Sequence, residues 1–285
     1  MIGIKLEGRL GNQMFQLITG LLNAKRLNTK LFIYEYPYLC LIFKTFEMPQ
    51  KGLSKWFIWQ YILLHKYLPN FRFRYRIRAL LLWITRKIFF SRYAEFGFEE
   101  PCNPNWFNLE DKTLIHGYFQ SWIHTFENKN WIQTELFKFL PSVKQEAQQW
   151  INQLPEHTRL VTLHVRKTDL SHVSASDEFY HSLIQELRSP GTLFVMMSDD
   201  LPYCRKIWGN ETDLIISDQN TSVDLFVMTQ ANIVITSNST FSWWGAFLNN
   251  RPDLIVYAPE YFMGVAEKKW IPFTIMPPDW IVRKV

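Results

Sequence analysis

Hydrophobic and polar positions near the start of the chain predict a strand, a helix and a second strand. Residues 2–6 form an apolar run typical of a strand, and residues 12–26 place apolar side chains at helical spacing. Residues 31–34 are again typical of a strand. This order is characteristic of a βαβ unit with a parallel sheet.

The middle of the chain contains a further strand and two helices. Residues 113–118 predict the strand, and Pro141 separates helical patterns over residues 128–140 and 142–154. We place a domain boundary directly after these helices, at residues 155–158.

From residue 156 onward, strand and helix patterns alternate more regularly. The predicted strands are residues 160–165, 193–197, 214–216, 233–236 and 254–257, and the predicted helices are residues 176–188, 223–230 and 242–249. We therefore expect an α/β fold with domains at residues 1–155 and 156–285. In parallel sheets of this kind, ligands bind at the carboxyl ends of the strands.

Composition is consistent with two folded domains. The chain has 285 residues, of which 47% are hydrophobic, and its longest uncharged apolar runs, at residues 56–64 and 79–85, are too short to span a bilayer. The first residues predict a strand and not a secretory signal, so we expect a cytoplasmic protein. Its three widely spaced cysteines predict neither a disulfide framework nor a zinc site, and we expect reduced core residues at Cys40, Cys102 and Cys204.

Positive charge is concentrated in one aromatic segment, residues 48–94. It contains ten basic residues and no acidic one, so the rest of the chain carries a net charge of −5 against +5 for the whole. Basic residues interleaved with aromatic ones are typical of a surface that lies against anionic lipid. A pair of cationic surface helices with aromatic inner faces explains the segment equally well. A nucleic-acid groove has similar composition, but we expect no nucleic-acid partner.

Four short polar residues lie between the strand at residues 233–236 and the following helix: Ser237, Asn238, Ser239 and Thr240. Unpaired N–H groups and the helix dipole make such a helix start a ready phosphate site. The alternative is an ordinary N-cap, which needs only one of these side chains.

The strand at residues 160–165 runs into a second polar group. Strand alternation places His164 and Arg166 on one face and Lys167 on the other. A guanidinium group can hold two phosphate oxygens at once, whereas an exposed ion pair is the structural alternative. Asp169 is placed to orient Arg166 or to cap the next loop. If Arg166 and the Ser237–Thr240 segment converge, a nucleotide diphosphate is the implied ligand.

Two other acidic positions have structural and functional interpretations. Asp224 could accept the N1–H and N2–H groups of guanine, or it could cap the helix after Ser222. Asp199 and Asp200 follow a strand and could start a helix. Because no D-x-D motif is present, we expect a metal-free mechanism in which cationic groups stabilise the leaving group.

The segment G-R-L-G-N-Q, residues 8–13, joins the first strand to the first helix. It is a weak dinucleotide signal because it lacks the full G-x-G-x-x-G pattern. Gly8 and Gly11 allow close approach of the backbone to a ligand, and we expect Asn12 at the helix N-cap. Simple turn chemistry explains the glycines equally well.

Together these segments resemble the bacterial α-1,2-fucosyltransferase family, glycosyltransferase family 11, and more distantly the α-1,6- and protein O-fucosyltransferases. The matching motifs are G-R-L-G-N-Q-M-F-Q at residues 8–16, H-G-Y-F-Q-S at 116–121, H-V-R-K-T-D at 164–169, M-S-D-D at 197–200 and S-N-S-T-F-S-W-W-G-A-F-L-N at 237–249. They occur in family order over nearly the whole chain except the basic segment.

The resemblance implies a GT-B architecture, in which two Rossmann-like domains face a cleft. Residues 1–155 would form the acceptor side, and residues 156–285 would bind GDP-L-fucose. It implies metal-independent transfer with inversion to the 2-hydroxyl of a galactose-containing glycan. The residues expected to be catalytic are Arg166, Asn12 and Asp169, and those expected to bind the donor are His164, Arg166, Lys167, Asp224, Asn238, Ser239, Thr240 and Gly11.

Departures from the family pattern leave the proton acceptor open. Lys167, Thr168 and Leu170 replace the second Arg, the Gly and the Tyr of the usual bacterial motif, and Ser174 stands where the α-1,6 relatives have a catalytic Glu. The remaining candidates for a base are His172, Asp169, Asp177 and Glu7, and we assign none of them.

The implied setting is surface-glycan or O-antigen synthesis. We expect a galactoside or oligosaccharide acceptor, carried on a lipid, and a peripheral position on the inner face of the cell membrane, which would give the basic segment a purpose. The alternatives are another linkage or GDP-sugar, and a non-catalytic glycan-binding subunit of a glycan assembly complex.

Overall fold

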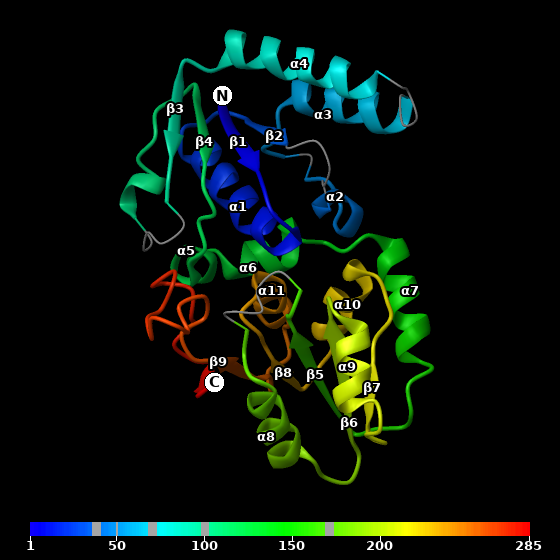
Figure 1. Cartoon of the computed structure of the whole chain (residues 1–285). Helices are drawn as coiled ribbons and strands as arrows, with labels where there is room; N and C mark the ends of the chain where they lie inside the picture. The colour runs from blue at the N-terminus through cyan, green and yellow to red at the C-terminus, as the bar shows by residue number, and fades with distance from the viewer. Residues whose placement is uncertain (36–40, 50, 68–72, 98–102, 169–173) are drawn as a thin grey trace. The chain divides into compact units, whose positions relative to one another are not determined.

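The computed structural model describes residues 1–35, 41–49, 51–67, 73–97, 103–168 and 174–285 (Figure 1). The chain forms two compact units. Unit 1 comprises Met1–Phe43 and Met48–Ser121, and unit 2 comprises Lys44–Glu47 and Trp122–Val285. The predicted boundary at residues 155–158 lies inside unit 2, because helix α7 (Pro141–Ile151) packs against α10 (Thr221–Met228). Glu146 on α7 accepts a hydrogen bond from Nδ2 of Asn220, directly before α10 (3.0 Å).

Unit 1 contains a four-stranded parallel sheet in the order β2-β1-β4-β3. The strands are β1 (Ile2–Leu6), β2 (Leu31–Glu35), β3 (Arg92–Glu95) and β4 (Thr113–His116). Helix α1 (Leu10–Arg26) connects β1 to β2 and packs on β1, which confirms the predicted βαβ opening. Its apolar face, with Met14, Phe15 and Ile18, is fully buried.

The basic segment of unit 1 forms helices. These are α3 (Lys55–Ile62), the π-helix η1 (Leu63–Tyr67) and α4 (Arg74–Phe89), as Figure 1 shows in blue and cyan. Thr85 of α4 is fully buried and accepts hydrogen bonds from Nε1 of Trp56 (2.9 Å) and Nε2 of Gln60 (3.1 Å) on α3. The two helices therefore contact each other through a buried polar group. Unit 1 also includes the 3₁₀ turn η2 (Pro104–Trp106), and α2 (Ile42–Thr45) crosses the division between the units.

Unit 2 contains a six-stranded parallel sheet in the order β10-β9-β8-β5-β6-β7. The strands are β5 (Arg159–Val165), β6 (Thr192–Ser198), β7 (Leu214–Ile216), β8 (Ile233–Ile235), β9 (Ile255–Pro259) and β10 (Ile281–Arg283). From β5, the chain builds the sheet outward through β6 and β7 and then returns to add β8, β9 and β10 on the other side. This is the order of a doubly wound sheet, and its topological switch point lies between β5 and β8.

Alternation along β5 separates an apolar face from a polar one. Val161, Leu163 and Val165 are fully buried in a core with α8 (Asp177–Leu187) and α9 (Leu201–Trp208). Thr162 and His164 are the intervening residues and are also buried. One side of the strand therefore faces a hydrophobic core. The other side carries the buried polar residues Thr162 and His164.

Edge strands and one broken helix differ from the sequence-based expectations. Strands β3 and β10 and helix α5 (Trp122–Glu127) were not predicted as elements. Residues 128–140 form α6 (Lys129–Trp131), the π-helix η3 (Ile132–Leu136) and then an extended segment, not one helix. The backbone N–H of Glu47 donates to the Lys138 carbonyl, and the N–H of Leu140 donates to the Thr45 carbonyl. These hydrogen bonds hold the end of this region in an extended conformation.

Two sequence-level expectations concern cysteines and membrane spans. Cys204 is a buried free thiol, and its pKa is raised to about 11, mainly because of its burial. Cys40 and Cys102 lie outside the described residues. Within the described part of the chain, none of the helices combines the length and apolar character needed to cross a bilayer.

Candidate functional site

The carboxyl ends of two adjacent strands define the candidate site in unit 2. Strands β5 and β8 pair directly, with Leu163 beside Ile235, and each runs into a polar segment. Arg166 follows β5, while Ser237 and Ser239 follow β8 and lead into α11 (Thr240–Leu248). The topological switch point of a doubly wound sheet is the usual ligand position. The fold thus brings together the two polar segments that the sequence analysis singled out.

His164 links the two strand ends. Its Nδ1 atom is hydrogen-bonded to Oγ of Ser237 (2.6 Å), and its ring contacts that of Phe241 with centroids 5.1 Å apart. The backbone N–H of Ser237 in turn donates to Oγ of Ser242 (3.1 Å). Because His164 is only 4% exposed, we interpret it as a buried positioning group for the segment that starts α11.

Arg166 is held in place by a carboxylate from the neighbouring strand. Its Nε atom lies 3.1 Å from Oδ2 of Asp199, which directly follows β6. Burial acts to raise the pKa of Asp199, but hydrogen bonds from Thr168 and from the Lys167 backbone, together with the Arg166 charge, lower it overall. An ionised Asp199 orients the guanidinium group through Nε. The orienting role predicted from the sequence was that of Asp169, which lies outside the described residues.

Lys167 lies on the opposite side of β5, as alternation predicts. Its Nζ atom is 3.1 Å from Asp177 and donates to the carbonyl of Ala175 (3.3 Å), and it also lies over the Tyr203 ring. The structure therefore does not bring Lys167 together with His164 and Ser237. These contacts also engage Asp177, one of the candidate bases.

The start of α11 combines a cap with one locked side chain. Ser239 is the N-cap, and its Oγ accepts a hydrogen bond from the backbone N–H of Phe241 (3.3 Å). The Asn238 amide is fully buried: its oxygen accepts from Ala175 N (3.0 Å) and its nitrogen donates to the Phe262 carbonyl. Asn238 thus fixes the loop, whereas Ser239 and Thr240 begin the helix where an anion is favoured.

Asp224 is a buried carboxyl group within α10. Desolvation raises its pKa to about 7; the hydrogen bond from Oγ of Ser217 (2.6 Å) opposes this effect, and the charge of Asp218 adds to it. Asn220 caps α10 by accepting hydrogen bonds from Ser222 and Val223. The alternative interpretation of Asp224 as the helix cap is therefore wrong. By contrast, Asp200 caps α9 by accepting from Tyr203 N (3.0 Å), which confirms the expected helix start.

The first glycine motif is held by side chains of unit 1. Helix α1 begins at Leu10 with Arg9 as its N-cap, so the prediction that Asn12 caps the helix is wrong. Asn12 instead accepts a hydrogen bond from Nε2 of Gln120 (3.0 Å). Gly8 has φ +71°, and a Cβ there would lie 2.4 Å from Nδ2 of Asn12. This position therefore requires glycine. Gly11 is buried within the first turn of α1.

A polar network that the sequence analysis largely missed lies at the carboxyl ends of β1, β3 and β4. Nε2 of His116 is 2.7 Å from Glu7, and its Nδ1 lies 3.2 Å from Glu95 and 3.1 Å from the Tyr93 hydroxyl. Burial acts to raise the pKa of Glu7, but hydrogen bonds from Lys5 and His116 lower it overall. Glu7 was considered as a base, but only the fold reveals its partners. The network offers several groups that can bind hydroxyls.

Other candidate groups give no additional base. Ser174 donates a hydrogen bond from its hydroxyl to the carbonyl of Arg166, and His172 lies outside the described residues. Within the described ranges, no three His, Cys, Asp or Glu side chains are grouped as metal ligands. Metal independence remains a prediction.

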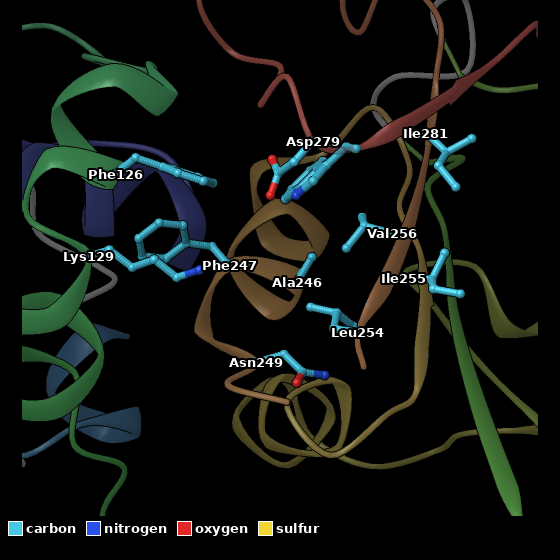
Figure 2. Close-up of a pocket in the computed structure, with 11 residues that line it drawn as sticks. Phe126, Lys129, Ala246, Phe247, Asn249, Leu254, Ile255, Val256, Asp279 and Ile281 are labelled. Carbon is cyan, nitrogen blue, oxygen red and sulfur yellow. The ribbon is translucent and has the colours of Figure 1, made fainter. Parts of the chain in front are cut away.

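A separate cavity in unit 2 lies at the other end of α11. It has a volume of about 180 Å³, and Figure 2 shows its lining residues, which include Phe126, Lys129, Phe247, Asp279 and Trp280. Because Phe247 and Asn249 mark the end of α11 and Ser239 its beginning, this cavity does not coincide with the candidate site. It contains none of the predicted site residues.

Comparison with known proteins defines the family. The profile of Glycosyl transferase family 11 matches residues 97–280. An Escherichia coli protein named alpha-1,2-colitosyltransferase is 26% identical over 304 aligned residues, covering 97% of each chain. Another E. coli protein, named O-antigen biosynthesis glycosyltransferase WbnK, is 24% identical over 297 residues, covering 93% of this chain and 96% of the relative.

Solved fucosyltransferases share the fold. The NodZ alpha-1,6-fucosyltransferase co-crystallised with GDP has a TM-score of 0.54 and 15% identity, covering 90% of this chain and 94% of NodZ. POFUT1 in complex with GDP-fucose has a TM-score of 0.50 and 13% identity, covering 90% of this chain and 97% of POFUT1.

The parallel α/β sheets and these similarities define a glycosyltransferase with a fucosyltransferase-like fold. Because the family profile covers more than half of its residues, the chain belongs to glycosyl transferase family 11. This confirms the resemblance that the sequence motifs indicated.

Proposed function

We propose that the chain is an inverting, metal-independent α-1,2-fucosyltransferase that moves L-fucose from GDP-L-fucose to a galactose-containing glycan. The proposal includes a GT-B architecture built from two Rossmann-like domains. The family, the O-antigen relative and the fucosyltransferase-like fold support the proposal.

The observation that carries the proposal is the pair of polar segments at the switch point. Arg166 follows β5, the N-terminus of α11 follows β8, and His164 is hydrogen-bonded to Ser237 across the two strands. A guanidinium group and a helix N-terminus are both suited to phosphate oxygens. Arg166, Ser239 and Thr240 are therefore the proposed diphosphate site.

The proposed chemistry is dissociation of a nucleoside diphosphate under cationic stabilisation. As the bond between the sugar and the β-phosphate oxygen lengthens, negative charge builds on GDP and positive charge on the sugar ring. Arg166, oriented by Asp199, stabilises the diphosphate more in the transition state than in the ground state. The acceptor hydroxyl attacks from the opposite face, which inverts the anomeric centre, and its proton leaves to a group that stays unassigned.

Asp224 is the proposed guanine-binding group. An ionised carboxylate can accept the N1–H and N2–H groups of guanine together, and neither adenine nor a pyrimidine presents that pair. Its burial would strengthen these hydrogen bonds once the base excludes water. This assignment makes donor binding dependent on the protonation state of Asp224.

The proposed setting is assembly of a surface glycan in the cytoplasm. The name of WbnK places that relative in O-antigen biosynthesis, which supports a glycan acceptor. The proposed acceptor is a galactoside carried on a lipid. Such an acceptor would require the enzyme to work at the inner face of the cell membrane as a peripheral protein.

A second candidate is transfer of colitose with the same linkage. The relative named alpha-1,2-colitosyltransferase aligns with 97% of this chain, which favours this donor over other GDP-sugars. Both candidates use the same proposed diphosphate site and differ only in the sugar that the site admits.

A donor panel tests the proposal. The purified chain is incubated with lactose and GDP-fucose, GDP-colitose or GDP-mannose, with EDTA present, and the linkage of the product is determined. The proposal predicts an α-1,2-fucosylated product despite EDTA. An α-1,2-colitosylated product would establish the second candidate, and GDP binding without transfer to any galactoside would instead indicate a non-catalytic glycan-binding subunit.

A further inference from the structure

The outer face of helices α3 and α4 in unit 1 carries large apolar side chains together with cations. We call it the basic aromatic face. Its exposed apolar members include Leu80, Trp83 and Ile88, with exposed fractions of 57%, 59% and 65%. Its full described set consists of Lys55, Trp59, Ile62, Arg76, Leu80, Trp83, Arg86, Lys87 and Ile88.

Helical spacing places four of these residues in one stripe of α4. Arg76, Leu80, Trp83 and Lys87 are separated by four, three and four residues, so they lie above one another on the same face. The apolar pair occupies the centre of the stripe, and a cation stands at each end. Arg86 adds a second cation beside Lys87.

Other residues of α3 and α4 form the buried contacts on the inner side of the helix pair. Thr85 is fully buried between α3 and α4, and Arg78 is only 6% exposed beside Phe57 and Leu82. The core of unit 1 therefore does not use Leu80 or Trp83. Exposed large apolar side chains in such a group normally mark an interaction surface.

The chemistry of the face selects its partner. Residues 48–94 include no acidic residue, so a negatively charged surface is electrostatically complementary. Tryptophan is favoured at the boundary between headgroups and acyl chains, where aliphatic side chains also leave water. A nucleic acid would pair with the cations but leave Leu80, Ile62 and Ile88 exposed. A second copy of the same face would bring like charges together.

We propose that the basic aromatic face is a docking surface for an anionic lipid bilayer. Helix α4 lies along the membrane plane, its central Leu80 and Trp83 enter the headgroup region, and Arg76, Arg86 and Lys87 bind lipid phosphates. This inference deepens the proposed function. It rests on the proposed function only where it invokes a lipid-linked acceptor. The membrane contact itself depends on no property of the donor site.

Vesicle sedimentation tests the proposal with two matched sets of variants. The full chain is mixed with vesicles of phosphatidylcholine alone or with added phosphatidylglycerol, at low and high salt. One variant combines Arg76→Gln, Arg86→Gln and Lys87→Gln, and the other combines Leu80→Ser and Trp83→Ser. Controls in unit 2 are Lys206→Gln and Phe273→Ser, which also change exposed residues.

The proposal predicts binding that requires phosphatidylglycerol and weakens with salt. Each cation removed weakens binding on the order of fivefold, the apolar variant also loses binding, and the controls bind as the wild type does. GDP binding, melting temperature and transfer to a soluble acceptor stay unchanged in all variants. Equal binding to both vesicle types, no binding, or equal losses in the controls would overturn it.

Two further readouts separate this inference from the proposed function and from other partners. If the chain binds vesicles but transfers no sugar, the result contradicts the proposed function and still supports the docking surface. A wild-type dimer that the Leu80→Ser, Trp83→Ser variant converts to a monomer would identify a second copy as the occupant and overturn the membrane proposal.

Discussion

Arg166 and Asp199 form the residue pair on which the proposed chemistry depends. Both side chains are about 90% buried. The contact between Nε of Arg166 and Asp199 fixes the orientation of the guanidinium plane. A planar group held in this way can present parallel N–H bonds to two oxygens, whereas an ammonium group acts as a point charge.

Replacing Arg166 with lysine should separate the effect of its positive charge from the effect of its bidentate geometry. We expect Arg166→Lys to lower kcat by about 100- to 1,000-fold, as loss of a preorganised transition-state donor does, while GDP still binds. Steady-state kinetics and a GDP titration measure both effects. Lys206→Gln, at an exposed basic position, is the control. Turnover close to that of the wild type in Arg166→Lys would remove the bidentate role.

In its proposed role as the guanine-binding group, Asp224 would make nucleotide binding sensitive to pH. Burial raises its pKa to about 7, and Ser217 and Asp218 are its recorded polar neighbours. The proposed contacts with guanine use the ionised form of Asp224, so below pH 7 binding would first have to remove a proton. We expect GDP affinity to fall about tenfold for each pH unit below 7 and to level off above it. Titration calorimetry at several pH values measures this dependence.

The same carboxyl group should affect stability in the opposite direction. Because its folded-state pKa is raised above the unfolded value near 4, its contribution is fully present below about pH 4 and is lost as pH rises towards 7. Asp224→Asn should flatten both dependences. A GDP affinity in the wild type that does not change between pH 5 and pH 8 would contradict the guanine assignment.

At the scale of elements, α10 and α11 position the site by packing closely. Gly245 of α11 faces Met228 at the end of α10, and a Cβ at residue 245 would lie 2.5 Å from Met228 Sδ and 2.8 Å from its Cβ. Asn249 adds hydrogen bonds from Nδ2 to the carbonyls of Met228 (3.1 Å) and Ala231 (2.8 Å). The contact fixes the helix whose N-terminus is the proposed phosphate site.

An added methyl group at this contact should destabilise the chain. We expect Gly245→Ala to lower the free energy of unfolding by about 1–3 kcal/mol, as overpacking does, measured by urea denaturation. Met228→Ala removes most of the opposing side chain, so Gly245→Ala should cost less in that background. An equal cost in both backgrounds would show that this contact is not the cause.

Elements with a strong apolar pattern were predictable, and exposed or irregular ones were not. Strand β5 is almost fully buried, so its pattern is continuous, and the polar residues after it mark a strand end. Strands β3 and β10 are sheet edges with exposed Tyr93, Ile281 and Val282, so burial does not impose a pattern on them. The π-helix η3 buries Ile132 and Leu136, a spacing of four residues that an α-helix shows as well.

Contacts between segments distant in the sequence explain the remaining differences in the site. Asp199 reaches Arg166 because β5 and β6 are paired neighbours, a contact that local spacing does not reveal. The same holds for His116, at the end of β4, and Glu7, directly after the paired strand β1. Arg166 and Ser239 could be identified from the sequence because Arg166 directly follows the buried strand β5 and Ser239 lies in the short polar segment between β8 and α11.

At the scale of the whole molecule, charge divides the chain into regions with different proposed partners. The ten basic residues of residues 48–94 lie in unit 1, whereas the proposed nucleotide site belongs to unit 2. A membrane and a nucleotide are both anionic, but the first needs an extended exposed surface and the second a fixed, buried arginine. The chain provides both, on different elements.

The most direct test of the central claim is a crystal structure of the chain with GDP. We expect the β-phosphate within hydrogen-bond distance of the Arg166 guanidinium group and of the backbone N–H groups at the start of α11, with guanine against Asp224. Density for GDP at any position away from Arg166 and Ser239 would contradict it.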